Sequence, residues 1–190
     1  MAQRQSSLSF RLMALEFKLR DWLSPRRAIL AETGIEAGMR VLDYGCGPGS
    51  YILPVAEMVG EAGSVYALDR HPLAIASVRR LSARAGLRNV ETILSDCNTG
   101  LGDGEVDVVL LYDVLHDIHD PGPLLTELHR VLKPEGILSF SDRHMKEEEI
   151  VHRLTGDGLF HPARRGRKTY SFSAVKPLPS DRINDERAAE

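Results

Sequence analysis

The chain of 190 residues has only two cysteines, little net charge and no long apolar run. Cys46 and Cys97 cannot form a framework of disulfides and lack the paired spacing of a zinc knuckle, so we expect a reducing, cytoplasmic setting. No segment approaches the roughly 20 apolar residues of a membrane-spanning helix, and the N-terminus lacks the apolar stretch of a signal peptide. A formal net charge of -3 and a pI near 6.2 provide no field that attracts polyanions. We therefore expect neither a nucleic acid nor a membrane as partner.

The composition is that of an ordinary globular protein, with 43% hydrophobic and 27% charged residues. A chain of this size buries roughly 70% of its unfolded surface, so it can fold without disulfides or a structural metal. We expect one domain over residues 1–176. The proline- and charge-rich residues 177–190 are expected to form a mobile tail. The sequence leaves the oligomeric state open.

The first 34 residues are expected to form two helices. Leucines recur at helical spacing between Ser7 and Leu23, beside an apolar arc that includes Phe10, Met13 and Phe17. This helix either packs against the domain or also forms a lid over a pocket. Ser24 as N-cap and Pro25 at the first helical position then predict a second helix that ends at Gly34.

From Arg40 onward, short β-branched or leucine-rich runs alternate with helical patterns, which indicates parallel strands joined by helices. The predicted strands are Arg40–Tyr44, Ser64–Asp69, Val90–Ser95, Val106–Tyr112 and Ile137–Ser141. The helices between them are predicted at about Ser50–Val59, Pro72–Ala85 and Gly122–Leu132. The fold class is therefore α/β, a Rossmann-like doubly wound sheet.

The strand Val106–Tyr112 is apolar on both faces, which places it in the middle of the sheet. A turn at Lys133–Gly136 precedes the fifth strand, because proline cannot continue a helix. A helix at Lys146–Leu154 follows, and then a hairpin of Leu159–Ala163 and Tyr170–Val175 closes the edge of the sheet. Its basic turn, Arg164–Lys168, is interpreted as a solvated hairpin tip rather than an anion site.

The strongest functional signal is Val41-Leu42-Asp43-Tyr44-Gly45-Cys46-Gly47-Pro48-Gly49-Ser50, a strand that runs into a glycine-rich turn before a helix. Three glycines at alternate positions let the backbone turn sharply and approach a ligand closely, next to the free N–H groups of a helix start. A tight strand-to-helix turn without a ligand would need only one glycine. We expect a ligand at this loop.

The charge next to this loop discriminates between ligands. A dinucleotide fingerprint needs glycine at the sixth position, which is Ser50 here, and Asp43 would repel a pyrophosphate by several kcal/mol. A ligand with an α-ammonium and a sulfonium would instead be attracted by Asp43. S-adenosylmethionine is such a ligand.

Further aspartates end the next two strands. Asp69 stands where a carboxylate can accept both ribose hydroxyls, and Asp96 where it can accept from the adenine amino group, with the backbone N–H of Cys97 available to a ring nitrogen. Any one of these aspartates could simply cap the following helix. Three aspartates at the ends of three successive strands, Asp43, Asp69 and Asp96, instead favour S-adenosylmethionine as the ligand.

The sequence from about Pro25 to Asp142 resembles the class I S-adenosylmethionine-dependent methyltransferases, most closely the small-molecule subgroup that includes quinone-biosynthesis enzymes. The resemblance is carried by the glycine loop, by Ala67-Leu68-Asp69, by Ser95-Asp96-Cys97 and by His129-Arg130-Val131-Leu132-Lys133-Pro134-Glu135-Gly136. It implies a seven-stranded sheet whose last strand is antiparallel. It further implies that the glycine loop contacts the methionine part, Asp69 the ribose, Arg70 the adenine face and Asp96 the adenine edge. The expected cofactor-binding residues are Asp43, Tyr44, Gly45, Cys46, Gly47, Gly49, Asp69, Arg70, Asp96, Cys97 and Asp113.

The segment after the fourth strand is the expected acceptor side. Asp113 matches the family position that touches the methionine portion or the acceptor. His116 and His119, with His144 further along, are candidate general bases, since an imidazole pKa near 6.5 suits proton removal at neutral pH. The alternative is that they are loop histidines making ordinary hydrogen bonds. A metal cluster of Asp117 with these histidines is disfavoured, because such spacing commonly arises without a metal.

Several acceptor classes lack their motifs. Asp113 is followed by Val114 and Leu115 rather than by the Pro-Pro-aromatic run typical of nucleic-acid and protein N-methylation, and no cysteine follows a proline as cytosine-carbon methylation needs. The resemblance implies three or more cysteines for arsenite, and only two are present. We therefore expect methyl transfer to a small organic molecule by in-line displacement. A non-catalytic module that binds the cofactor or S-adenosylhomocysteine is the alternative, and a nicotinamide oxidoreductase is a weaker third.

Overall fold

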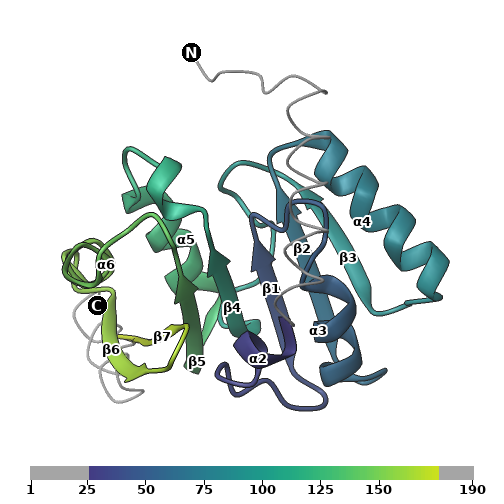
Figure 1. Ribbon diagram of the computed structural model, residues 1–190, viewed down its shortest axis with the longest axis horizontal. Helices are drawn as coiled ribbons and strands as arrows, with labels where there is room; N and C mark the ends of the chain where they lie inside the picture. The colour runs from purple at the N-terminus through teal and green to yellow at the C-terminus, as the bar shows by residue number, and fades with distance from the viewer. Residues whose placement is uncertain (1–25, 176–190) are drawn as a thin grey trace, which may run out of the picture.

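Seven strands in the order β3-β2-β1-β4-β5-β7-β6 form one sheet in the computed structural model, which describes residues 26–175 (Figure 1). The first five strands are parallel, and β7 is antiparallel to both β5 and β6. The strands are β1 (Arg40–Tyr44), β2 (Ser64–Asp69), β3 (Val90–Leu94), β4 (Val106–Tyr112), β5 (Leu132–Ser141), β6 (Phe160–Arg165) and β7 (Tyr170–Ala174). The predicted α/β sheet with an antiparallel last strand is confirmed.

Helices lie before β1 and after every parallel strand except β3. They are α2 (Arg26–Leu30), α3 (Ile52–Val59), α4 (Pro72–Ala85), the short 3-10 helix η1 (Leu115–Asp117), α5 (Gly122–Val131) and α6 (Glu147–Thr155). None of these helices has the length and apolar character that a bilayer crossing requires. Helix α2 ends at Leu30, and a turn rather than a helix continues to Gly34. The predicted helix at Ser7–Leu23, the Ser24–Pro25 cap and the tail at 177–190 lie outside the described residues.

The fifth strand begins at Leu132, five residues earlier than predicted. Its pairing with β4 passes from Val106 opposite Leu132 directly to Val108 opposite Ile137, with a register shift between them. The predicted turn residues Lys133–Gly136 thus have no β4 partner in the ladder. Proline and glycine in this segment therefore cause an irregularity within β5 rather than a separate loop before it.

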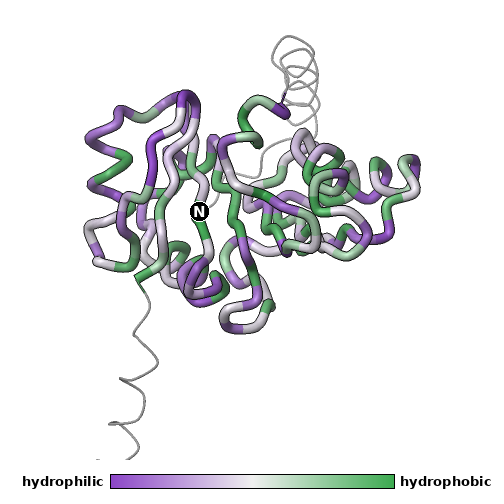
Figure 2. Tube along the Cα trace, turned by 90° about the horizontal axis from the view of Figure 1, so that it is seen from below, coloured by the Kyte–Doolittle hydropathy of each residue, from purple (hydrophilic) through white to green (hydrophobic). Residues whose placement is uncertain are grey.

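Apolar residues of the sheet build two cores, one on each face. Alternate residues of β4 contribute to both, with Val108, Leu110 and Tyr112 in the core under α2, α3 and α4, and with Val109 and Leu111 in the core under α5 and α6. Figure 2 shows the hydrophobic segments running through the middle of the molecule and hydrophilic ones at outer turns and loops. The predicted central position of Val106–Tyr112 is confirmed, since β4 is the fourth of seven strands.

The hairpin of β6 and β7 is held to the turn after α2 by one carboxylate. Oε2 of Glu32 accepts hydrogen bonds from the backbone N–H groups of Lys168 and Thr169, both at 3.1 Å, and from the hydroxyl of Thr169 at 2.9 Å. Burial alone would raise the pKa of Glu32, but these hydrogen bonds outweigh it and lower the pKa. The basic turn is therefore organised around a carboxylate of the same chain.

Replacing Glu32 with glutamine tests this attachment. We expect Glu32→Gln to lower the free energy of unfolding by about 1–2 kcal/mol at neutral pH, because the charge-assisted hydrogen bonds are lost. A carboxyl whose pKa is lowered by folding stabilises the protein above its unfolded pKa of 4.5 and loses this effect as the pH falls through the folded value. Urea denaturation at neutral and acidic pH measures both effects. The exposed Glu36→Gln is the control, and equal stabilities of the two variants would contradict the assignment.

Candidate functional site

The glycine loop leaves β1 by a turn that only glycine accommodates at low cost. Gly45 and Cys46 both donate their backbone N–H to the carbonyl of Leu68, at 2.8 and 2.9 Å, and Gly45 has φ +75°. A Cβ on Gly45 would lie 2.4 Å from Cγ2 of Val114. The loop after β4 is therefore packed directly on the glycine loop.

The far end of the glycine loop is packed against α4. Gly49 has φ +97°, and a Cβ there would lie 3.2 Å from Val78 and 3.3 Å from Leu81. Ser77, on the same helix, donates its hydroxyl to the carbonyl of Pro48 at 3.0 Å. The loop is thus enclosed between α4 and the segment after β4.

Asp69 connects the end of β2 to the glycine loop. One carboxylate oxygen accepts the backbone N–H of Gly47 at 2.9 Å, and the other accepts that of His71 at 2.8 Å. This carboxylate, which the sequence predicts to bind the ribose, therefore fixes the conformation of the loop. The neighbouring Arg70 is exposed.

Asp43 is a buried carboxylate at the base of the loop, with 2% of its surface exposed. Its Oδ2 has no hydrogen-bond partner among residues 26–175. Burial raises the pKa of Asp43 to about 7, with a further rise from the charge of Asp69 and an opposing effect of Arg26. An unpaired acceptor beside a second carboxylate suits a ligand that brings a positive charge. Burial, together with the charges of Asp43 and Asp69, raises the pKa of the Cys46 thiol.

Tyr44 links the loop to the end of β3. Its buried side chain donates a hydrogen bond of 2.5 Å to the carbonyl of Asp96, and burial is the largest cause of its raised pKa. Asp96 itself is exposed, and the N–H of Cys97 donates to Oγ of Ser95 at 3.3 Å. The structure therefore brings Tyr44, Asp69 and Asp96 to one edge of the sheet.

A carboxylate on α5 holds the segment that follows Asp96 and Cys97. Glu127 accepts from both the N–H and the hydroxyl of buried Thr99, at 2.8 and 2.5 Å, and from Arg130. The hydrogen bonds from Arg130 lower the pKa of Glu127 to about 2. Burial opposes this effect, and the hydrogen bonds from Thr99 add to it. This charged anchor was not predicted, although Arg130 lies in the motif that carries the resemblance.

At the next strand end, Asp113 adopts a backbone conformation that is uncommon outside glycine, with φ +54°. Its N–H donates to the carbonyl of Ser141 on β5 at 2.8 Å, and its Oδ1 accepts the N–H of Arg143 at 3.2 Å. Such strain persists where the surroundings hold it, and it is frequent at functional sites. Here it directs the chain after β4 toward the end of β5.

The three candidate bases differ in their surroundings. Nδ1 of His116 lies 2.8 Å from Oδ2 of Asp142, and its ring centroid lies 4.4 Å from that of His144. Nε2 of His144 accepts from Nε of Arg143 at 3.1 Å. His119 is exposed and contacts neither of the other two histidines through any bond or ring contact that the structure describes.

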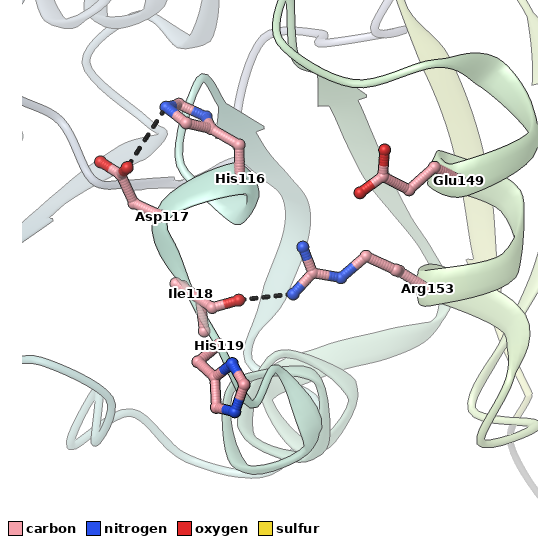
Figure 3. A pocket seen from close by; sticks show the side chains of 6 residues that line it. All are labelled: His116, Asp117, Ile118, His119, Glu149 and Arg153. Carbon is pink, nitrogen blue, oxygen red and sulfur yellow. Dashed lines mark hydrogen bonds and ion pairs between the residues drawn. The ribbon is translucent and has the colours of Figure 1, made fainter.

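A cleft of about 440 Å³ lies between the segment after β4 and helix α6. It is lined by His116, Asp117, Ile118, His119, Glu149 and Arg153. Figure 3 shows His116 and His119 at opposite ends of this lining, with Glu149 and Arg153 reaching in from α6. Arg153 donates to the carbonyls of Leu115 and Ile118, which fixes η1 against α6. The lining is mainly polar.

Asp142 is a functional candidate that sequence reasoning missed. Its side chain is fully buried, with 0% exposed, at the end of β5. The signal was present, since Asp142 directly follows the predicted strand Ile137–Ser141, just as Asp96 directly follows the predicted strand Val90–Ser95. Within residues 26–175 no group of three or more His, Cys, Asp or Glu side chains is placed to hold a metal ion. The histidines near Asp117 therefore form no such group.

Comparison with known proteins agrees with this geometry. A family model described as a methyltransferase domain matches residues 35–162. The chain is 34% identical over 146 residues to aklanonic acid methyltransferase DauC of Streptomyces sp. (strain C5), an alignment that covers 62% of this chain and 66% of that protein. It is 32% identical over 120 residues to the demethylmenaquinone methyltransferase of Geobacillus stearothermophilus, covering 62% and 51%.

An arsenite methyltransferase of Aquipseudomonas alcaligenes is 35% identical over 150 residues, covering 67% of this chain and 43% of that protein. The chain thus spans about two fifths to two thirds of the length of these relatives. Among solved structures, a SAM-dependent methyltransferase from Aquifex aeolicus superposes with a TM-score of 0.70 at 28% identity, covering 84% of this chain and 96% of that one.

Packing of Val114 on Gly45 can be measured by a double-mutant cycle. We expect Gly45→Ala to lower the free energy of unfolding by about 2–4 kcal/mol, because it adds both backbone strain and a clash with Val114. In the Val114→Ala background the clash disappears, so the loss should shrink by about 1–3 kcal/mol.

Gly34→Ala isolates the backbone contribution, since Gly34 also has φ +75° but a Cβ there would meet no atom within 4 Å among the described residues. Urea denaturation of the five proteins measures the cycle. Strictly additive effects of Gly45→Ala and Val114→Ala would contradict the packing.

Proposed function

Because the chain belongs to the S-adenosylmethionine-dependent methyltransferase family, we propose that it transfers a methyl group from S-adenosylmethionine to a small-molecule acceptor. The observation that carries this proposal is the buried carboxylate oxygen of Asp43 at the base of the glycine loop, which none of the described residues pairs. A dinucleotide would bring its pyrophosphate to this carboxylate and to Asp69. A cationic methyl donor satisfies the orphaned acceptor instead.

In this proposal, different residues of the chain bind different parts of the cofactor. Asp43 and the glycine loop, from Tyr44 through Gly49, hold the methionine part, and Asp69 and Arg70 hold the ribose and the adenine face. Asp96 and Cys97 hold the adenine edge, and Asp113 closes the site toward the acceptor. When bound, the cofactor supplies an activated methyl group on a sulfonium, so the protein has mainly to align the acceptor and exclude water.

The acceptor is proposed to enter from the segment after β4, where His116, His119 and His144 are candidate bases. Two relatives are named for small organic acceptors, aklanonic acid and demethylmenaquinone. A third is named for arsenite, but the chain has only two cysteines, of which Cys46 is buried in the glycine loop. These observations favour an organic acceptor. The two free cysteines also suit a reducing cytoplasmic setting.

Binding and transfer are tested separately. Calorimetric titrations with S-adenosylmethionine, S-adenosylhomocysteine and NAD are expected to show binding of the first two only. Incubation with methyl-labelled cofactor and a small-molecule fraction of cell extract is expected to yield a labelled organic product. Tight binding without any transfer would favour the non-catalytic module, and preferential binding of NAD would contradict the proposal.

Cofactor affinity should depend on pH through Asp43. Because its pKa is raised to about 7, the carboxylate is mostly protonated at about pH 6 and mostly ionised at about pH 8. Only the ionised form attracts an ammonium group, so we expect S-adenosylhomocysteine to bind about tenfold more tightly at the higher pH. Asp43→Asn should bind weakly and without this dependence.

Exposed Asp157→Asn is the matched control and should retain the wild-type profile. Calorimetry in buffers of equal ionic strength measures the affinities. An unchanged pH dependence in Asp43→Asn would show that another group receives the cation.

A further inference from the structure

His116 and Asp142 form a pair at the acceptor side of the site. The carboxylate of Asp142 is fully buried, whereas the side chain of His116 is 24% exposed. An ionised carboxylate only accepts hydrogen bonds, so the 2.8 Å contact makes Nδ1 of His116 the donor. The proton of the neutral ring therefore sits on Nδ1, and the lone pair of the ring sits on Nε2.

The structure holds this geometry from several sides. Asp142 also accepts the backbone N–H of His116 at 3.3 Å and that of His144 at 3.0 Å, so it is locked between β5 and the segment after β4. The ring of His144 lies against the ring of His116 at 4.4 Å. The orientation of His116 is thus determined by its neighbours rather than by solvent.

The other nitrogen of His116 is placed to receive a proton. Nε2 lies 3.6 Å from Oδ1 of Asp117, which is too long for a hydrogen bond but close enough for attraction to a charged ring. A proton taken up at Nε2 would therefore be flanked by one carboxylate at each ring nitrogen. Figure 3 shows Asp117 beside His116 at the edge of the cleft that Glu149 and Arg153 also line.

The two other histidines are less suitable as bases. Nε2 of His144 already accepts from Arg143, so its lone pair is engaged. His119 is exposed at the opposite end of the cleft lining, with no carboxylate bonded to its ring in the part of the chain that the structure describes. Among the three, only His116 combines a fixed tautomer with a nitrogen directed away from its buried partner.

The pair also lies close to the proposed cofactor site. Val114, two residues before His116, packs on Gly45 of the glycine loop. Asp113 and Asp142 directly follow the adjacent parallel strands β4 and β5, whose last residues, Tyr112 and Ser141, are paired. The same edge of the sheet therefore carries the glycine loop and the His116–Asp142 pair.

We propose that His116 is the general base of the reaction, that Asp142 positions it, and that the acceptor is a proton-bearing hydroxyl or an acidic carbon. This inference rests on the proposed methyl transfer. The acceptor atom forms a bond to the methyl carbon while the carbon–sulfur bond breaks and its electron pair remains on sulfur. The proton of the acceptor passes to Nε2 of His116, and S-adenosylhomocysteine and imidazolium result.

The first experiment determines the tautomer without any substrate. Long-range ¹H–¹⁵N correlation spectra of the imidazole rings, assigned with His116→Gln, are expected to show neutral His116 protonated at Nδ1 in the wild type. Asp142→Asn keeps the size of the side chain and one acceptor oxygen but can also donate, so we expect the ring proton to shift toward Nε2. A wild-type ring protonated at Nε2, or a tautomer unchanged by Asp142→Asn, would overturn the positioning role.

The second experiment identifies the acceptor atom. Acceptor panels of phenols, hydroquinones, β-diketones, tertiary amines and thioethers are incubated with S-adenosyl-[methyl-¹³C]methionine, and the ¹³C shift of the product methyl shows the atom that received it. We expect transfer to oxygen or carbon, with a loss of about 100-fold or more in kcat for His116→Gln and for Asp142→Asn. Exposed His161→Gln is the control and should retain the wild-type rate.

Transfer to the amines or thioethers, or a kcat that survives in His116→Gln, would overturn the base assignment. Absence of transfer to every acceptor despite cofactor binding would instead contradict the proposed function. The tautomer experiment still decides the His116–Asp142 pair in that case. The two failures are therefore distinguishable.

Discussion

A buried carboxylate oxygen that no described residue pairs is the feature on which the proposed site depends. Leaving an acceptor such as Oδ2 of Asp43 unsatisfied costs about 1–3 kcal/mol, and the nearby charge of Asp69 adds to the cost. A fold retains such a group when the surrounding packing is strong enough to hold it. Here β1 lies between β2 and β4, with apolar cores on both faces of the sheet.

The parallel arrangement explains why the candidate site residues converge. Successive parallel strands end at the same edge of the sheet, so Asp43, Asp69, Asp113 and Asp142 are brought together although they are far apart along the chain. The surroundings of these carboxylates differ. Asp69 accepts from the glycine loop and Asp113 stands next to Arg143, whereas Asp43 keeps a buried oxygen without a partner in residues 26–175. Asp69 and Asp113 thus support the loops, whereas Asp43 is the carboxylate that we propose for the cationic ligand.

Local patterns allowed most of the fold to be predicted, but not its long-range side-chain contacts. The strands Arg40–Tyr44, Ser64–Asp69 and Val106–Tyr112 match the prediction residue for residue, because β-branched runs and glycine turns act over short distances. The predicted start of β5 was wrong, because proline and glycine can cause an irregularity within a strand without ending it. Contacts such as His116 with Asp142, 26 residues apart, depend on the pairing of β4 with β5, which periodicity does not reveal. Likewise Glu32 meets the hairpin across 137 residues.

The same reasoning explains why one histidine of three stands out. Residue type alone makes His116, His119 and His144 equivalent, since each carries an imidazole with the same intrinsic chemistry. Their difference comes from the partner of each ring, a buried carboxylate for His116 and a guanidinium for His144. A carboxylate accepts the ring N–H and so fixes which nitrogen carries the proton, whereas a guanidinium donates to the lone pair of the nitrogen that it faces. The proposed role of His116 as a base therefore depends on the junction between β4 and β5, which the order of the strands brings together.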